Sequence, residues 1–290
     1  MQDVFIIDGI RTAIGNFGGT LAPVRTDDLG AIVMKELMAR NANFDPSEIE
    51  DVIFGCANQA GEDNRNVARM SSLLAGIPIA AGAETVNRLC ASGMASTINA
   101  ARAIKDGAGD IYISGGVEHM TRGPWVISKV SKPFGRDAEM HDSSFGWRFV
   151  NPKMKELFGT DGMGVTAENL VAQYGISRAD QDQFAFWSQM KATAAQKSGR
   201  LAEEIVAVEI PQRKKDPIIF DQDEFIKPNS SLEILGNLRA AFKKEGGSVT
   251  AGNASGLNDG AVALLIAGES AVKRNNFKPK IGRASCRERV

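Results

Sequence analysis

The sequence predicts an α/β fold, and two patterns indicate it. Short apolar runs of strand length recur along the chain, at residues 4–8, 51–55, 84–87, 110–115 and 262–267. Segments with apolar residues at helical spacing lie between several of them, at 28–38, 66–74 and 91–104. Several strand-like runs are continuously apolar rather than alternating, which is typical of a sheet covered on both faces. Strands that alternate with helices therefore predict a layered α/β sandwich.

The middle of the chain has a different character. From Met120 to about Gly247 it is richer in charge, aromatic residues and proline, and it contains a clear helix at 178–197 with Ser177 as its N-cap. We interpret this region as an insertion. The predicted organisation is a core part at 1–119, a lid domain inserted at 120–247, the end of the core part at 248–280, and a non-native tail at 281–290.

Composition excludes several classes of function. The 290 residues carry a net charge of -1, so neither nucleic acid nor an anionic membrane is expected as a partner. The three cysteines are too few and too scattered for a disulfide framework or a metal site, which fits a reducing compartment. No apolar run reaches the roughly 18 residues of a membrane span, and the N-terminus does not resemble a secretory signal. We expect a cytoplasmic protein without a metal.

Cys90 is the candidate nucleophile. It follows the strand-like run at 84–87 and precedes the helix at 91–104, so the helix N-terminus points N–H groups and a partial positive charge at its side chain. Such an environment favours the reactive thiolate. The small residues Ala91, Ser92, Gly93 and Ala95 keep the first helical turn thin enough for an acyl group to approach. From spacing alone, a buried and inert cysteine in a tightly packed helix is equally consistent.

Five motifs carry a family resemblance that favours the first interpretation. The run VNRLCASGMA at 86–95 resembles the acyl-cysteine motif of the thiolases, which cleave or form 3-oxoacyl-CoA. The same family order is kept by GCANQAGEDNRNVAR at 55–69, GGVEHMTR at 115–122, TAEN at 166–169 and VTAGNASGLNDG at 249–260. Two runs, GCANQAGEDNRNVARM and GWRFVNP, resemble the 3-oxoadipyl-CoA (β-ketoadipyl-CoA) thiolases of aromatic catabolism most.

The resemblance implies a fold and a reaction. The fold is a layered αβαβα arrangement of two similar halves, of which this chain would supply the N-terminal half with its lid, in an enzyme that is a homodimer or homotetramer. The reaction is acyl transfer: Cys90 attacks the 3-oxo carbon, acetyl-CoA leaves as an enolate, and CoA collects the acyl group. Coenzyme A is thus a co-substrate, and no permanently bound cofactor is implied.

The resemblance also implies catalytic helpers that this sequence does not contain. The family's Asn-Glu-Ala-Phe, Gly-His-Pro and Cys-x-Gly-Gly-Gly-like motifs, which supply an oxyanion site, a base and a second cysteine, do not occur. His119 and His141 are the two histidines, and packing or solvation explains each more simply than service as the base. The last ten residues resemble one translated frame of a sequencing-adapter oligonucleotide. We therefore expect a truncated chain that is inactive by itself.

Four further residues are candidates for substrate binding. Ser255 matches a family serine that contacts the pantetheine arm of CoA, and Met163 a methionine that lines the acyl pocket, although core packing explains Met163 nearly as well. Lys227 falls where some relatives place an arginine near the adenine of CoA, and a solvated lysine is the alternative. Arg148 is the candidate cation for the distal carboxylate of a dicarboxylic acyl chain. We interpret residues 258–260 as a turn and helix cap.

Two other functions stay open from the sequence. A thiolase for acetoacetyl-CoA or general 3-ketoacyl-CoA would use the same cysteine with another acyl chain. A non-catalytic thiolase relative that only binds CoA or lipid would form no acyl-Cys90 adduct when the full-length parent is incubated with acetyl-CoA.

Overall fold

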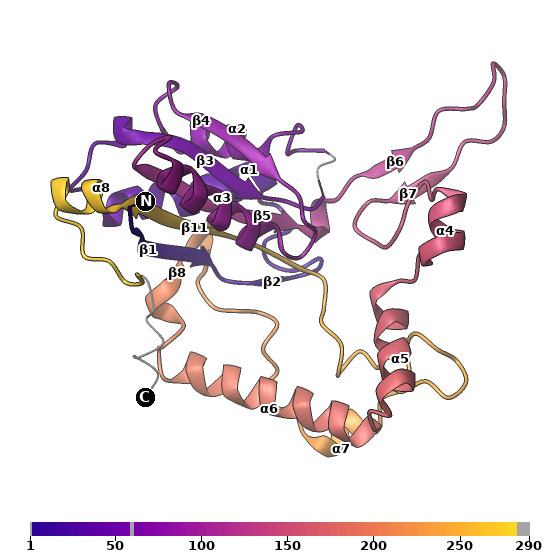
Figure 1. Cartoon of the computed structure of the whole chain (residues 1–290). Coiled ribbons are helices and arrows are strands. Elements are labelled where there is room, and N and C mark those ends of the chain that lie inside the picture. Colours follow the sequence, from indigo (N-terminus) through magenta and orange to yellow (C-terminus); the bar gives the residue numbers. More distant parts are fainter. Residues whose placement is uncertain (1, 59–60, 283–290) are drawn as a thin grey trace. The chain divides into compact units, whose positions relative to one another are not determined.

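The computed structural model describes residues 2–58 and 61–282 and divides into two compact units (Figure 1). The first unit takes the described residues of Met1–Arg122, Ala202–Glu224 and Asn258–Val290. The second takes Gly123–Leu201 and Phe225–Leu257. Each unit has its own helices and strands.

The first unit is built on a seven-stranded mixed sheet. Its strands are β1 (Val4–Thr12), β2 (Gly15–Asn16), β3 (Ile49–Gly55), β4 (Gly82–Val86), β5 (Ile111–His119), β8 (Ile205–Val206) and β11 (Asn258–Gly268). The order is β4-β3-β5-β11-β1-β8, with β2 paired to β11. β3 runs parallel to β4 and β5, whereas β11 runs antiparallel to β5 and β1.

Helices cover both faces of this sheet. The helices of the unit are α1 (Thr26–Arg40), α2 (Val67–Leu74), α3 (Ser92–Asp106) and α8 (Glu269–Arg274). Successive strand residues point to opposite faces. Val52 and Phe54 accordingly belong to the core under α1 and α2, while Ile53 packs with Ala100 and Ile104 of α3. The continuous apolar runs of the sequence are therefore strands buried on two faces, as predicted.

The segment 202–224 belongs to the first unit, although the sequence analysis placed it in the insertion. The reason is a set of polar contacts between residues that are far apart in the sequence. Arg11 of β1 binds Glu204 at 2.9 Å and Asp223 at 2.8 Å. The Glu224 carboxylate accepts hydrogen bonds from the backbone N–H of Asn16 and Thr20. A small hairpin, β9 (Val208–Gln212) with β10 (Lys215–Phe220), completes the segment.

The second unit consists of helices and one short hairpin. Its elements are β6 (Trp125–Ile127), β7 (Met140–Asp142), α4 (Pro152–Phe158), α5 (Met163–Tyr174), α6 (Arg178–Lys197) and α7 (Leu232–Gly236). α6 begins as the sequence predicts, because the Ser177 side chain accepts a hydrogen bond from the Asp180 N–H. Residues 248–257 also lie in this unit. The domain boundaries drawn from the sequence thus differ from the compact units at two places, and as a division of the family fold they stay a prediction.

Candidate active site

Cys90 lies at the junction where β4 ends and α3 begins, and its side chain is exposed. Strand β4 is the edge strand of the sheet, so residues 87–91 leave it at the border of the unit (Figure 1). All five of these residues are exposed to solvent. The inert buried cysteine that spacing alone allowed is therefore not what the structure contains.

Glycines let the first turn of α3 approach the sheet closely. A Cβ atom at Gly55, the last residue of β3, would lie only 2.4 Å from the Ser92 carbonyl carbon and 2.6 Å from the Gly93 nitrogen. On the same face, the Ser96 hydroxyl donates to the Gly115 carbonyl at 2.8 Å and accepts from the Gly115 N–H at 3.1 Å. These contacts fix the helix N-terminus, and with it Cys90, over the end of β3 and the middle of β5.

Side chains on either side of Cys90 hold the turn that carries it. The Asn87 side-chain Oδ1 accepts the N–H of Leu89 at 2.8 Å. The Ser92 hydroxyl accepts the N–H of Arg88 at 2.8 Å and donates to the Leu89 carbonyl at 2.6 Å. Leu89 has φ = 52°, a left-handed conformation that is costly for a residue with a branched side chain. The turn is thus a bend that local hydrogen bonds stabilise.

The N-terminus of α3 is open to an anionic group. Its N-cap residue, Ala91, makes no side-chain capping hydrogen bond. The first N–H groups of a helix lack intrahelical partners and carry a partial positive charge. A thiolate at Cys90, or an oxyanion formed on an attached acyl group, would be stabilised by this end of the helix.

The two histidines have partners other than Cys90. His119, at the end of β5, is buried; its Nε2 lies 3.1 Å from the Leu21 carbonyl oxygen and its Nδ1 3.3 Å from Asp259 Oδ1. His141 belongs to β7 of the second unit, and its Nε2 lies 3.4 Å from Glu139. Packing and local pairing account for both side chains, in line with the simpler interpretation from the sequence.

The structure corrects the prediction for residues 258–260. They are not a turn and helix cap but the first residues of β11. Asp259 is buried, and its carboxylate accepts hydrogen bonds from the Thr121 backbone N–H, at 3.0 Å, and from the Thr121 hydroxyl. Burial by itself would raise the pKa of Asp259, but hydrogen bonds from His119 and Thr121 hold it below the usual value. This cluster anchors the strand.

The other cysteines are different from Cys90. Cys56 is 1% exposed, and burial together with the negative charges of Glu118 and Asp63 raises the pKa of its thiol. A buried neutral thiol is a poor nucleophile. Cys286, like residues 283–290 of the predicted tail, lies outside the described residues.

The candidate CoA-binding loop belongs to the second unit. Ser255 is exposed on the segment that follows Val249. Glu168 of α5 accepts the N–H groups of Ser248 and Val249 at 2.8 Å each, and Asn253 donates to Asp182 of α6 at 2.9 Å. The loop is therefore held by α5 and α6.

The three remaining candidates also lie in the second unit. Met163, at the start of α5, is 78% exposed, so core packing does not explain it. Lys227 is exposed, with its Nζ 5.5 Å from the centre of the Phe225 ring. Arg148 is half-buried and donates to the Ser143 carbonyl at 3.2 Å. Cys90 belongs to the other unit, so the internal geometry of each unit does not test the five residues as one site.

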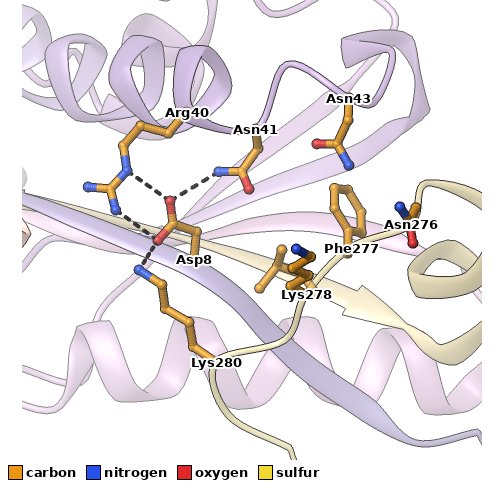
Figure 2. Close-up of a pocket in the computed structure, with 9 residues that line it drawn as sticks. Asp8, Arg40, Asn41, Asn43, Asn276, Phe277, Lys278 and Lys280 are labelled. Carbon is orange, nitrogen blue, oxygen red and sulfur yellow. Dashed lines mark hydrogen bonds and ion pairs between the residues drawn. The ribbon is translucent and has the colours of Figure 1, made fainter.

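The first unit also holds a depression of about 430 Å³ away from Cys90, shown in Figure 2. Its floor is the buried Asp8, which contacts Arg40 Nε at 3.0 Å, Asn41 Nδ2 at 3.1 Å and the Lys280 ammonium. Burial raises the pKa of Asp8, but the hydrogen bonds from Lys280, Gly9 and Asn41 and the charge of Arg40 outweigh it and lower the pKa. Two of the cations at the depression therefore already have an internal counter-ion, and the cluster ties the 276–280 segment to β1.

Comparison with known proteins identifies the family. The protein family described as "Thiolase, N-terminal domain" matches residues 4–270 of this chain. The chain belongs to the thiolase family. Over 280 residues it is 52% identical to a β-ketoadipyl-CoA thiolase of Acinetobacter baylyi, with 97% of this chain and 70% of that protein covered. It is 53% identical, with the same coverage, to the 3-oxoadipyl-CoA/3-oxo-5,6-dehydrosuberyl-CoA thiolase of Escherichia coli K12.

A solved thiolase-family structure has the same fold. The crystal structure of the Bacillus anthracis acetyl-CoA acetyltransferase matches with a TM-score of 0.86 at 36% identity, covering 96% of this chain and 68% of that one. The family, the enzyme class and the thiolase-like fold predicted from the motifs are thereby confirmed. The roles of Cys90, Ser255, Met163, Lys227 and Arg148 in this thiolase-family chain stay predictions.

Within residues 2–58 and 61–282 of this thiolase-family chain, no helix is both long and apolar enough to cross a bilayer. Within the same residues, no group of three or more His, Cys, Asp or Glu side chains is arranged to hold a metal ion.

Proposed function

We propose that Cys90 of this thiolase-family chain accepts the acyl group of a 3-oxoacyl-CoA. The thiolate attacks the 3-oxo carbon and the C2–C3 bond breaks. Acetyl-CoA leaves as an enolate that takes up a proton, and the acyl group stays on sulfur as a thioester. Coenzyme A then attacks this thioester, releases the new acyl-CoA and returns the thiol.

One observation carries the proposal: Cys90 is exposed at the uncapped N-terminus of α3, on a turn fixed by its own hydrogen bonds. The helix end supplies electrostatic stabilisation for both the thiolate and a developing oxyanion. Cys56, by contrast, is buried and has a raised thiol pKa, so of the two described cysteines only Cys90 is exposed to a substrate.

The substrate we propose is 3-oxoadipyl-CoA, which would give succinyl-CoA and acetyl-CoA. The similarity to proteins named for this substrate, at 50–53% identity, supports it. The distal carboxylate of a succinyl group needs a cation, and Arg148 is the residue we assign to it. Ser255, Met163 and Lys227 would contact the pantetheine arm, the acyl chain and the adenine end of CoA.

We further propose that these 290 residues do not sustain turnover by themselves. The family's base motif is missing from the sequence, and both histidines are engaged with other groups. Acyl transfer from acetyl-CoA to Cys90 needs only a nucleophile, so a single acylation is compatible with this proposal. The homodimeric or homotetrameric assembly and the cytoplasmic location expected for the family are parts of the same proposal.

The test is an adduct experiment. The chain is incubated with acetyl-CoA or succinyl-CoA, and its peptides are analysed by mass spectrometry while released CoA is titrated. We expect one acyl group per chain on Cys90 and no more than one equivalent of CoA. Cys90→Ser should take up nothing, and Cys56→Ser is the matched control that should behave as the parent. An unmodified Cys90 would contradict the enzyme proposal and favour a relative that only binds CoA or lipid.

Arg148 gives the test of the substrate. A hydrogen bond to a charged group contributes about 1.5–3 kcal/mol, so Arg148→Ala should slow acylation by succinyl-CoA roughly ten- to hundredfold. Acetyl-CoA has no distal carboxylate, and its rate should not change. Equal losses with both thioesters would refute the assignment. The second candidate, a general 3-ketoacyl-CoA or acetoacetyl-CoA thiolase, is favoured by the likeness to the Bacillus anthracis acetyl-CoA acetyltransferase.

A further inference from the structure

A carboxylate on β5 holds the loop that faces the Cys90 turn. Glu118 Oε2 accepts the backbone N–H of Ala57 at 2.8 Å, and Oε1 accepts that of Asn58 at 3.0 Å. Oε1 also lies 3.9 Å from Cys56 Sγ, a weak thiol donor, so both oxygens act as acceptors. An ionised carboxylate is an acceptor at both oxygens, whereas an amide of the same length has one acceptor and one donor group. Only glutamate can satisfy both N–H groups at this position without moving the loop.

The same loop contacts the turn through Asn87. The Asn87 Nδ2 donates to the Ala57 carbonyl at 3.0 Å, while its Oδ1 accepts the Leu89 N–H at 2.8 Å. One side chain therefore connects the loop to the residue directly before Cys90. Asn87 is itself exposed, so these two hydrogen bonds rather than packing determine its orientation.

Leu89 is the residue that needs this support. Its φ of 52° costs about 1–2 kcal/mol for an L-residue other than glycine. Its side chain is 70% exposed and gives little packing in return. Hydrogen bonds to its N–H and carbonyl, from Asn87 and Ser92, offset the strain. If the Asn87 contact is lost, the turn can relax and Cys90 moves relative to the α3 N-terminus.

We propose that Glu118 is a positioning residue for the Cys90 thiol and acts through Asn87. It fixes Ala57 and Asn58, the Ala57 carbonyl orients Asn87, and Asn87 keeps Leu89 in the conformation that places Cys90 at the helix N-terminus. Its relevance to catalysis rests on the proposed role of Cys90 as acyl acceptor. Glu118 does not contact the thiol of Cys90 in this account; its effect passes through backbone geometry.

The experiment measures thiol reactivity and needs no CoA. Cys90 is alkylated with iodoacetamide between pH 6 and 9, and the modified peptide is quantified by mass spectrometry. We expect Glu118→Gln and Asn87→Ala each to slow alkylation at pH 7 about tenfold, because Cys90 no longer lies where the helix N-terminus points its N–H groups. The double variant should be no slower than either single variant, since both remove the same connection.

A matched control removes a carboxylate from the other end of the same strand. Asp110 directly precedes β5 and accepts hydrogen bonds from Ser270 at 2.6 Å and Gln2 at 3.2 Å, far along the sheet from the loop. Asp110→Asn should leave the pH profile of Cys90 unchanged. Far-UV circular dichroism reports whether each variant is folded; Cys56 cannot serve for this, because its thiol itself contacts Glu118. If Glu118→Gln loses the circular dichroism signal, Asn87→Ala alone decides, because an exposed side chain can be removed without opening the core.

Three results would overturn the proposal: a folded Glu118→Gln with the parental profile, an unchanged profile in Asn87→Ala, or effects of the two substitutions that multiply. The test is separable from that of the proposed function. Loss of Cys90 alkylation in these variants with no acyl adduct in the parent would support positioning and refute acyl transfer. An acyl adduct in the parent with unaltered alkylation in the variants would do the reverse.

Discussion

The contact between Gly55 and the first turn of α3 predicts that one methyl group at residue 55 pushes the helix off the sheet. The added carbon would lie 2.4 Å from the Ser92 carbonyl carbon, whereas carbon atoms pack favourably at about 3.5–4.0 Å. The helix must therefore retreat by about 1 Å in Gly55→Ala. Because the nearest atoms belong to the backbone, no side-chain rotation can relieve the overlap.

The expected loss follows from the contacts that the retreat disturbs. Overpacking in a close-packed interior costs about 1–3 kcal/mol. The retreat also stretches the two Ser96–Gly115 hydrogen bonds, at 2.8 and 3.1 Å, which contribute about 1 kcal/mol each. We expect Gly55→Ala to lower the free energy of unfolding by about 3 kcal/mol, a large share of the roughly 5–15 kcal/mol typical of a protein.

The assay is urea unfolding followed by far-UV circular dichroism, with Cys90 alkylation measured in parallel. Gly93→Ala is the matched control from the opposite side of the same contact. A carbon added there has the Gly115 carbonyl oxygen, at 3.7 Å, as its nearest neighbour, and alanine is favoured over glycine in a helix by about 1 kcal/mol. Gly93→Ala should therefore be neutral or stabilising. A Gly55→Ala protein that unfolds at the parental urea concentration would refute the reasoning, as would equal damage from both substitutions.

Three further predictions concern stability. Hydrogen bonds from Arg122 lower the pKa of Glu62 to about 2, so Glu62 stabilises the fold above its unfolded pKa of about 4.3 and most of this effect is lost as the pH falls to 2. Glu62→Gln should therefore cost about 3 kcal/mol at pH 7 and less than about 0.5 kcal/mol at pH 2, measured by urea unfolding. Burial and the charge of Glu118 raise the pKa of Asp63, so the fold is stabilised by the protonated carboxyl and loses this stabilisation as the pH rises through that pKa. Asp63→Asn should raise the free energy of unfolding by about 1 kcal/mol at pH 7. An increase that persists at pH 3 would contradict this. Leu89→Asn should raise the urea midpoint, because asparagine adopts the left-handed conformation more easily and relieves up to about 1 kcal/mol of backbone strain. The reactivity of Cys90 should stay unchanged. A lower midpoint would show that the leucine side chain stabilises the fold.

The regular elements of the first unit were predictable because burial leaves a local signature. A strand covered on both faces must be apolar at successive positions, as Val52, Ile53 and Phe54 are, and the two core clusters divide them by face. The start of α6 was predictable for a similar reason. Ser177 caps its own helix, so the contact that defines the boundary spans only three residues.

The incorrect prediction, at residues 258–260, has the opposite property, and so does the placement of 202–224 in the first unit. Asn258, Asp259 and Gly260 favour a turn locally, but Asp259 is held in β11 by Thr121, 138 residues away. The 202–224 segment is bound to β1 through Arg11 and Asp223, 212 residues apart. Contacts over such separations leave no periodic trace in the chain, so local propensity pointed elsewhere.

The candidate site divides along the same line. Cys90 could be identified because its strand-to-helix junction and thin first turn are encoded within ten residues. Its support could not, because Asn58 meets Glu118 across 60 residues and Ala57 meets Asn87 across 30. Glu118 and Asn87 both belong to motifs quoted from the sequence, but only the fold shows that they are connected. A substitution beside Cys90 therefore alters the surroundings of the thiol directly. A substitution at Glu118 alters the reactivity of the thiol only if Asn87 is present to connect the two. The double variant of Glu118→Gln with Asn87→Ala distinguishes these two cases.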